Sequence, residues 1–97
     1  MDSLLPDVLK FTNRDFDLEI PVSEVSSQDE FLKLLTRVIQ HLLDKDFERL
    51  MNGLYRIDVD ENKVKLAMTT DQVAENIARL IIERELQKVE TRRKYSS

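Results

Sequence analysis

Residues 71–94, DQVAENIARLIIERELQKVETRRK, decide the fold class of this chain. Large apolar side chains recur every three or four residues, from Val73 through Ile77 and Ile81 to Val89, and neither Gly nor Pro interrupts them. This spacing places them on one face of an α-helix. At 1.5 Å per residue, such a helix is about 30–36 Å long. We therefore expect its last turns to project from a small helical bundle.

Two further helices are predicted upstream, over residues 28–44 and 46–56. Ser27 with Glu30 three residues later forms a capping box, and Asp46 can cap the second of these helices. Apolar residues cover about half the circumference of the first helix, which indicates contact with more than one neighbour. The second helix is amphipathic, and its predicted core face consists of Phe47, Leu50, Met51 and Leu54, with Ile57 as a further candidate just past its end.

Residues 54–68 allow two interpretations. Tyr55, Ile57 and Val59 alternate with polar residues and could form a hairpin with the segment that follows the turn, which would make the fold α+β. A capping pattern at Asp58 and Glu61 instead predicts a short helix. We favour the helix, because an isolated hairpin is only marginally stable without a third strand or a packed helix.

The N-terminal segment, residues 1–25, is the least regular part of the sequence. Residues 1–30 of the chain contain eight acidic and two basic side chains, a net charge of −6, whereas the whole chain carries −4. Leu4, Leu5 and Val8 have helical spacing, but Phe16, Leu18, Ile20 and Val22 alternate with polar residues. We expect an extended, irregular acidic arm here.

The predicted architecture is a single all-α domain over residues 1–97. It consists of the arm (1–25) and a helical core (26–97), with four or five helices in a bundle-like arrangement and a long C-terminal helix. Ninety-seven residues suffice for one domain only.

Composition indicates a cytoplasmic protein that does not enter a membrane. The chain has no Cys, which excludes disulfides and thiolate metal sites. The N-terminus lacks the pattern of a signal peptide. Continuous apolar runs end after three residues, far below the roughly 20 that span a bilayer.

The sequence contains no pattern that predicts catalysis or a bound cofactor. His41 is the only histidine, so a transition-metal site or a catalytic triad lacks partners. Residues 58–62 (DVDEN) resemble the start of a calcium loop, but Lys63 replaces the required Gly and Thr69 the required Glu. We therefore predict no catalytic residues, no metal, no cofactor and no enzymatic activity.

The favoured function is a non-enzymatic interaction module. The long C-terminal helix carries more apolar surface than a small domain needs for its own core, so a partner protein or a second copy in a homodimer could bury the excess. The candidate apolar residues are Ile81, Ile82, Leu86 and Val89, with Arg84, Lys88 and Arg92 as a polar rim. Alternatively, the N-terminal arm covers this face through Phe11, Phe16 and Ile20.

The second candidate function is weak binding of nucleic acid. Arg92, Arg93 and Lys94 could contact phosphates, and Tyr95 could stack on a base. Basic residues in a last turn also complement the helix dipole. The acidic net charge argues against a dedicated nucleic-acid binder.

Residues 47–51 (FERLM), 54–59 (LYRIDV) and 80–95 (LIIERELQKVETRRKY) resemble a group of small uncharacterised bacterial helical proteins. The resemblance covers about the C-terminal half of the chain. It implies a bacterial origin and favours a helix over residues 58–68, and it implies no activity, cofactor or site residues.

Overall fold

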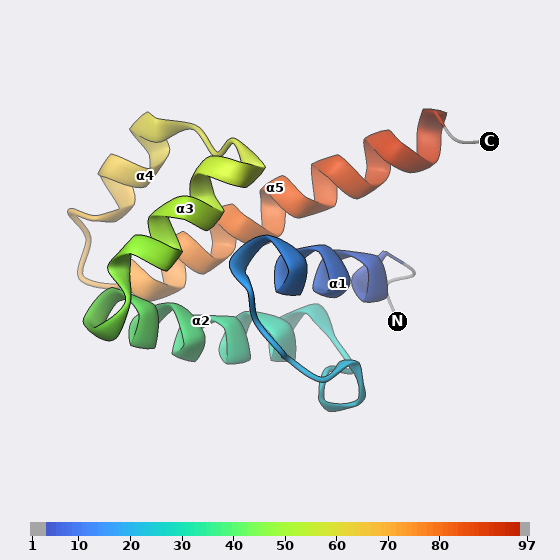
Figure 1. Cartoon of the computed structure of the whole chain (residues 1–97), viewed down its shortest axis with the longest axis horizontal. Helices are drawn as coiled ribbons and strands as arrows, with labels where there is room; N and C mark the ends of the chain where they lie inside the picture. Colours follow the sequence, from blue (N-terminus) through green and yellow to red (C-terminus); the bar gives the residue numbers. More distant parts are fainter. Residues whose placement is uncertain (1–3, 96–97) are drawn as a thin grey trace.

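The computed structural model describes residues 4–95, and the architecture of this range is all-helical (Figure 1). The elements are α1 (Leu5–Phe16), the 3₁₀ turn η1 (Val22–Glu24), α2 (Gln28–Lys45), α3 (Phe47–Ile57), α4 (Glu61–Ala67) and α5 (Val73–Tyr95). No strand occurs between residues 4 and 95. The predicted all-α fold with a long last helix is therefore confirmed.

Helix α5 is the element on which the others assemble. It packs against α1, α2, α3 and α4, and α2 is its most extensive neighbour. Its buried apolar residues recur with helical spacing at Ile77, Ala78, Ile81, Ile82 and Val89. Side chains 91–95 are exposed, and the end of α5 extends past the neighbouring helices (Figure 1). None of the helices in the described range is long and apolar enough to cross a membrane.

The starts of α2 and α3 follow the capping residues that the sequence predicts. The Ser27 hydroxyl accepts a hydrogen bond from the Glu30 backbone N–H at 3.1 Å. The Asp46 carboxylate accepts one from the Arg49 N–H at 3.3 Å. Each bond satisfies an N–H that has no partner inside its helix.

Residues 54–57 end α3 and residues 61–67 form α4, so the hairpin alternative is wrong. Asp58 adopts a left-handed conformation (φ 59°) that ends α3. Asp60 then accepts a hydrogen bond from the Asn62 N–H at 2.8 Å and starts α4. The predicted cap at Asp58 is therefore also wrong, because this residue closes one helix while Asp60 opens the next.

The predicted extended arm is wrong over residues 5–16, which form α1. Leu5, Val8, Leu9, Thr12 and Phe16 are buried with helical spacing. This buried stripe runs from Leu5 to Phe16. The sequence analysis assigned Phe16 to an extended segment, because it begins a run of apolar residues that alternate with polar ones. Burial of one amphipathic face outweighs the weak alternation that follows it.

The chain is extended only beyond α1. Asp17 ends this helix with φ 55°. Asn13 then holds the following segment through two hydrogen bonds to the backbone of Ile20, at 2.9 and 3.0 Å. Leu18 N–H also donates to the Asn13 carbonyl at 2.8 Å, so Asn13 binds the returning chain through both its side chain and its backbone.

Candidate functional site

The apolar residues predicted to bind a partner lie mainly in the core of this chain. Ile81, Ile82 and Val89 are 0, 4 and 1% exposed. Leu86 is partly buried beside Leu32 of α2. Because α1 and α2 already cover this side of α5, these residues do not form an exposed apolar patch. Helix α1, which belongs to the N-terminal segment, packs against α5, and Phe11 lies beside α5, whereas Phe16 lies against Gly53 of α3.

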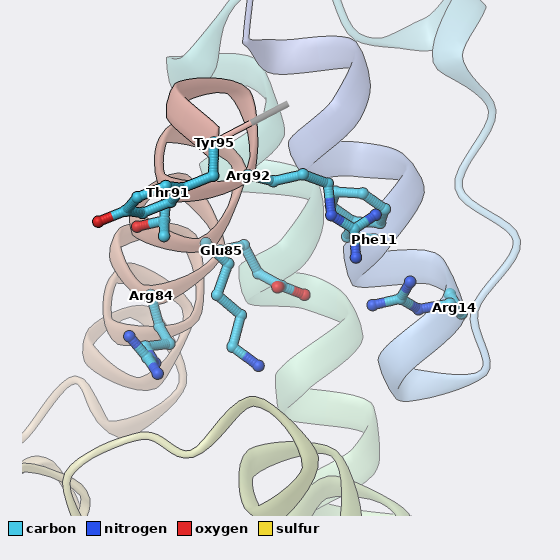
Figure 2. Close-up of a pocket in the computed structure, with 8 residues that line it drawn as sticks. Phe11, Arg14, Arg84, Glu85, Thr91, Arg92 and Tyr95 are labelled. Carbon is cyan, nitrogen blue, oxygen red and sulfur yellow. The ribbon is translucent and has the colours of Figure 1, made fainter. Parts of the chain in front are cut away.

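The predicted polar rim instead lines a hollow between α1 and α5, shown in Figure 2. Arg84, Lys88 and Arg92 are spaced four residues apart on α5 and therefore share a face. The hollow has a volume of about 690 Å³, and its other lining residues are Phe11, Arg14, Glu85, Thr91 and Tyr95. We call it the basic hollow.

Two of these cations also join α5 to the end of α3. The Arg84 Nε–H donates to the Ile57 carbonyl at 2.8 Å. Lys88 Nζ donates to the Arg56 carbonyl at 3.4 Å. Cations at the last carbonyl groups of a helix complement its dipole. Arg84 and Lys88 thus stabilise helix packing as well as lining the hollow.

The four residues predicted to contact nucleic acid do not form one surface. The Arg92 guanidinium stacks over the Phe11 ring, 4.7 Å from its centre. Arg93 pairs with the Asp7 carboxylate at 2.7 Å. Lys94 and Tyr95 are exposed at the end of α5. Successive positions of a helix point about 100° apart, so Arg92, Arg93 and Lys94 face different directions.

Glu85 is the feature of the basic hollow that the sequence analysis missed. Its side chain is 0% exposed, and its carboxyl group lies beside that of Asp15, to which a proton on Glu85 can donate a hydrogen bond. A buried acid is costly in a folded protein unless it is neutral or has such a partner. The available signal was its position, since Glu85 lies four residues from both Ile81 and Val89 and so continues the buried stripe of α5.

The environment of Glu85 favours the protonated acid. Burial raises its pKa to about 8, and the neighbouring carboxyl group of Asp15 acts in the same direction, whereas Lys88 and Arg14 oppose the shift. Asp15 is itself paired with Arg14, whose Nε lies 3.1 Å from a carboxylate oxygen. Glu85 thus carries a proton at neutral pH beside the ion pair of Arg14 and Asp15.

A second surface feature is an exposed apolar stripe on α3. Phe47, Met51 and Tyr55 follow one another at intervals of four residues and are 46, 38 and 89% exposed. The prediction that Phe47 and Met51 belong to the core is therefore wrong. The buried face of α3 is formed by Leu50, Gly53, Leu54 and Ile57. The helix carries two adjacent apolar stripes, and only one faces the core.

The exposed stripe borders a groove between α3 and α4. Met51 and Tyr55 line this groove together with Leu54, Val59 and Val64, and its volume is about 360 Å³. Its remaining lining residues are all acidic: Asp58, Asp60 and Glu61. We refer to this site as the α3–α4 groove. It combines an apolar floor with a negative rim.

Neither feature has the composition of a metal centre. Within residues 4–95, no group of three or more His, Asp or Glu side chains is placed to hold a metal ion. His41 is an exposed residue of α2. Asp60, in the segment that resembles a calcium loop, caps α4.

Comparison with known proteins identifies no relative of this chain. No family model, no curated protein and no solved structure matches it. The resemblance of residues 47–59 and 80–95 to a bacterial family therefore stays a prediction. Function has to be inferred from the side chains that the fold exposes.

Proposed function

We propose that this protein is a non-enzymatic interaction module of the bacterial cytoplasm that binds a basic amphipathic helix of a partner protein in the α3–α4 groove. The observation that carries the proposal is the exposed stripe Phe47, Met51 and Tyr55 beside the acid-rimmed groove. Large aromatic side chains left in water on one face are typical of binding surfaces.

The apolar part of the groove suits a helical ligand. Tyr55 and Met51 lie one turn apart on α3, and Val64 of α4 faces the same groove. An amphipathic helix binds such a surface with side chains at positions i, i+3, i+4 and i+7. Most of the area of Tyr55 is available to such a ligand, because it is 89% exposed.

The acidic part of the groove selects the charge of the ligand. Asp58, Asp60 and Glu61 lie in the link between α3 and α4 and at the start of α4. A partner with Lys or Arg beside its apolar face gains attraction here, and an acidic partner is repelled. The proposed ligand is therefore basic as well as amphipathic.

A partner protein fits this groove better than a second copy does. The basic segment of this chain is the end of α5, which contains Arg92, Arg93 and Lys94. Its neighbouring apolar residue Val89 is buried in the core, which leaves Tyr95 as the exposed ring of that segment. One ring offers little apolar surface for the stripe on α3.

Site-specific photocrosslinking in cells that express the full chain tests the proposal. A benzoylphenylalanine residue replaces Tyr55 in one variant and the exposed Val22 of η1 in the control. We expect a discrete crosslinked protein from position 55 that is absent from position 22. Mapping should place the crosslink on a basic amphipathic helix of the partner.

A charge-neutralised form of the crosslinking variant distinguishes specific docking from nonspecific hydrophobic binding. Asp58→Asn with Glu61→Gln removes two charges from the rim, and Asn tolerates the left-handed conformation of residue 58. The crosslink should weaken severalfold, while the circular dichroism of the chain stays unchanged. A crosslink to a second copy would contradict the partner and indicate self-association. No crosslink, or one insensitive to the rim charges, would remove the proposal.

A further inference from the structure

The basic hollow is independent of the α3–α4 groove, and its geometry points to a different ligand. Four cationic side chains line it: Arg14 from α1, and Arg84, Lys88 and Arg92 from α5. In Figure 2, the Arg14 guanidinium and the Glu85 carboxyl group point toward each other across the space between α1 and α5. The charge of the lining favours an anion.

Phe11 holds two of these cations in place. The guanidinium groups of Arg14 and Arg92 lie 4.6 and 4.7 Å from the centre of its ring. Stacking engages the flat face of a guanidinium and leaves its edge for hydrogen bonds. Arg14 already donates from Nε and Nη2 to the Asp15 carboxylate, at 3.1 and 3.4 Å, so its remaining N–H groups are the ones that a ligand can reach. Two long side chains that would otherwise be mobile are thus oriented around one aromatic ring, which lowers the entropy cost of binding.

Glu85 is a buried acid in the wall of this hollow. An ionised carboxylate would repel an anion and compete for the same cations, whereas a protonated carboxyl group is uncharged and leaves these cations to the ligand. Burial, with the neighbouring Asp15, raises the pKa of Glu85 to about 8, so the proton is present at neutral pH.

We propose that the basic hollow binds the phosphoryl group of a small organic ligand, held by the cations of Arg14, Lys88 and Arg92. A phosphoryl group presents three oxygens in different directions and up to two negative charges, which matches cations that approach from two helices. A carboxylate presents two oxygens that a single arginine can satisfy. The volume of about 690 Å³ leaves room for an organic part against Tyr95 and Phe11.

The charged groups around Glu85 come from three helices. They are Arg14 and Asp15 on α1, Arg56 on α3, which donates to the Asp15 carbonyl at 3.1 Å, and Arg84, Lys88 and Arg92 on α5. The buried residues of α2, the principal neighbour of α5, are apolar. Loss of the Glu85 proton therefore adds a negative charge among these groups, which weakens their attraction for an anion.

Sulfate is the first probe, because it does not titrate between pH 7 and pH 9. We expect sulfate to shift the Nε–H signals of Arg14 and Arg92 in NMR spectra of the full chain. Its affinity should fall about tenfold from pH 7 to pH 9, as the protonated fraction of Glu85 falls. In Glu85→Gln the binding should persist without this pH dependence, which a purely structural role of Glu85 would not produce.

Arg92→Gln provides the variant that tests the cations. Arg92 is an exposed residue, so the chain should remain folded, and we expect sulfate affinity to drop at least tenfold. Arg79→Gln is the matched control, because Arg79 lies on α5 outside the hollow and pairs with Glu75. The proposal would be overturned if Arg92→Gln and Arg79→Gln lost equal sulfate affinity, or if sulfate did not shift the arginine signals. It would also be overturned if sulfate binding to Glu85→Gln kept the pH dependence of the wild type.

Two organic probes identify the source of the phosphoryl group. Phenyl phosphate should bind more tightly than inorganic phosphate, because its ring can lie against Tyr95 or Phe11. A short single-stranded oligonucleotide carries phosphodiesters and bases. If the oligonucleotide bound more tightly than phenyl phosphate, with a steep dependence on salt, the ligand would be nucleic acid and the proposed small molecule would be wrong.

Discussion

The ring of Phe16 on α1 lies directly against the Cα atom of Gly53 on α3. A β-carbon built on Gly53 would overlap the Phe16 ring atoms Cδ1, Cε1 and Cγ, far inside van der Waals contact. Gly53 therefore allows α1 and α3 to approach closely at this ring. Glycine weakens a helix interior, and the contact with Phe16 explains why this position has no side chain.

Gly53→Ala should lower the free energy of unfolding by about 1–3 kcal/mol, because the added methyl group displaces the buried ring of Phe16. Urea denaturation measures the change. Asn52→Ala, at the exposed neighbouring position of the same helix, is the control and should be neutral or slightly stabilising. If Gly53→Ala gained about 1 kcal/mol from helix propensity, the close packing would be absent.

Asp17→Gly should raise the free energy of unfolding by about 0.5–1 kcal/mol. Asp17 has φ 55° and ψ 53°, a left-handed conformation that Gly adopts without strain. Asp17→Val should lower stability by about 1–2 kcal/mol for the opposite reason. Glu19→Gly is the control, because Glu19 lacks a positive φ and should only lose stability. Thermal unfolding of the three variants gives the comparison.

Glu85→Gln should change how stability depends on pH. The pKa of Glu85 is about 8 in the folded chain and near 4.5 as a free side chain. Between these values the folded state binds more protons than the unfolded state, so the wild type loses stability as pH rises from about 4.5 to about 8.

The variant lacks this loss, which amounts to roughly 3–5 kcal/mol across the window. Urea denaturation of both proteins at several pH values, in buffer free of phosphate and sulfate, measures the difference. Parallel curves for wild type and variant would show that Glu85 ionises in the folded chain as it does in water.

Ile81→Ala should lower the free energy of unfolding by about 2–5 kcal/mol, because it leaves a cavity at a fully buried position. The loss should not depend on protein concentration, since the contacts of Ile81 lie within one chain. Leu66→Ala, at an exposed residue of α4, is the control and should change little. A melting temperature that rises with protein concentration in the wild type and not in Ile81→Ala would place Ile81 at an interface between copies.

Helix positions could be predicted well because their signals are local. Ser27 and Asp46 start α2 and α3 as expected, since a capping bond joins residues only three positions apart. The extended arm was mispredicted because Phe16 fits both a period of two and the helical stripe that begins at Leu5. Packing against α3 and α5 decides between these patterns, and neither helix is near α1 in the sequence.

The candidate sites could be predicted only in part. The spacing of Arg84, Lys88 and Arg92 indicates a shared face, and they do line one hollow. Their counterparts Phe11 and Arg14 come from the other end of the chain, so no local pattern could include them. The surface of α3 was missed because Phe47 and Met51 look like core residues on a helical wheel.

The sequence by itself determined that this chain is helical and that thiol chemistry is absent. It also located α2, α3 and α5 to within two residues at each end. These properties follow from periodicity, capping and composition, which act within a few residues. Only the tertiary structure decided which apolar stripe of α3 is buried and which faces water. It also decided that Glu85 is buried beside Asp15, 70 positions away in the sequence. The burial and the charge environment of a residue depend on the helices that pack around it. The arrangement of these helices follows from contacts between distant segments, so no single segment determines it.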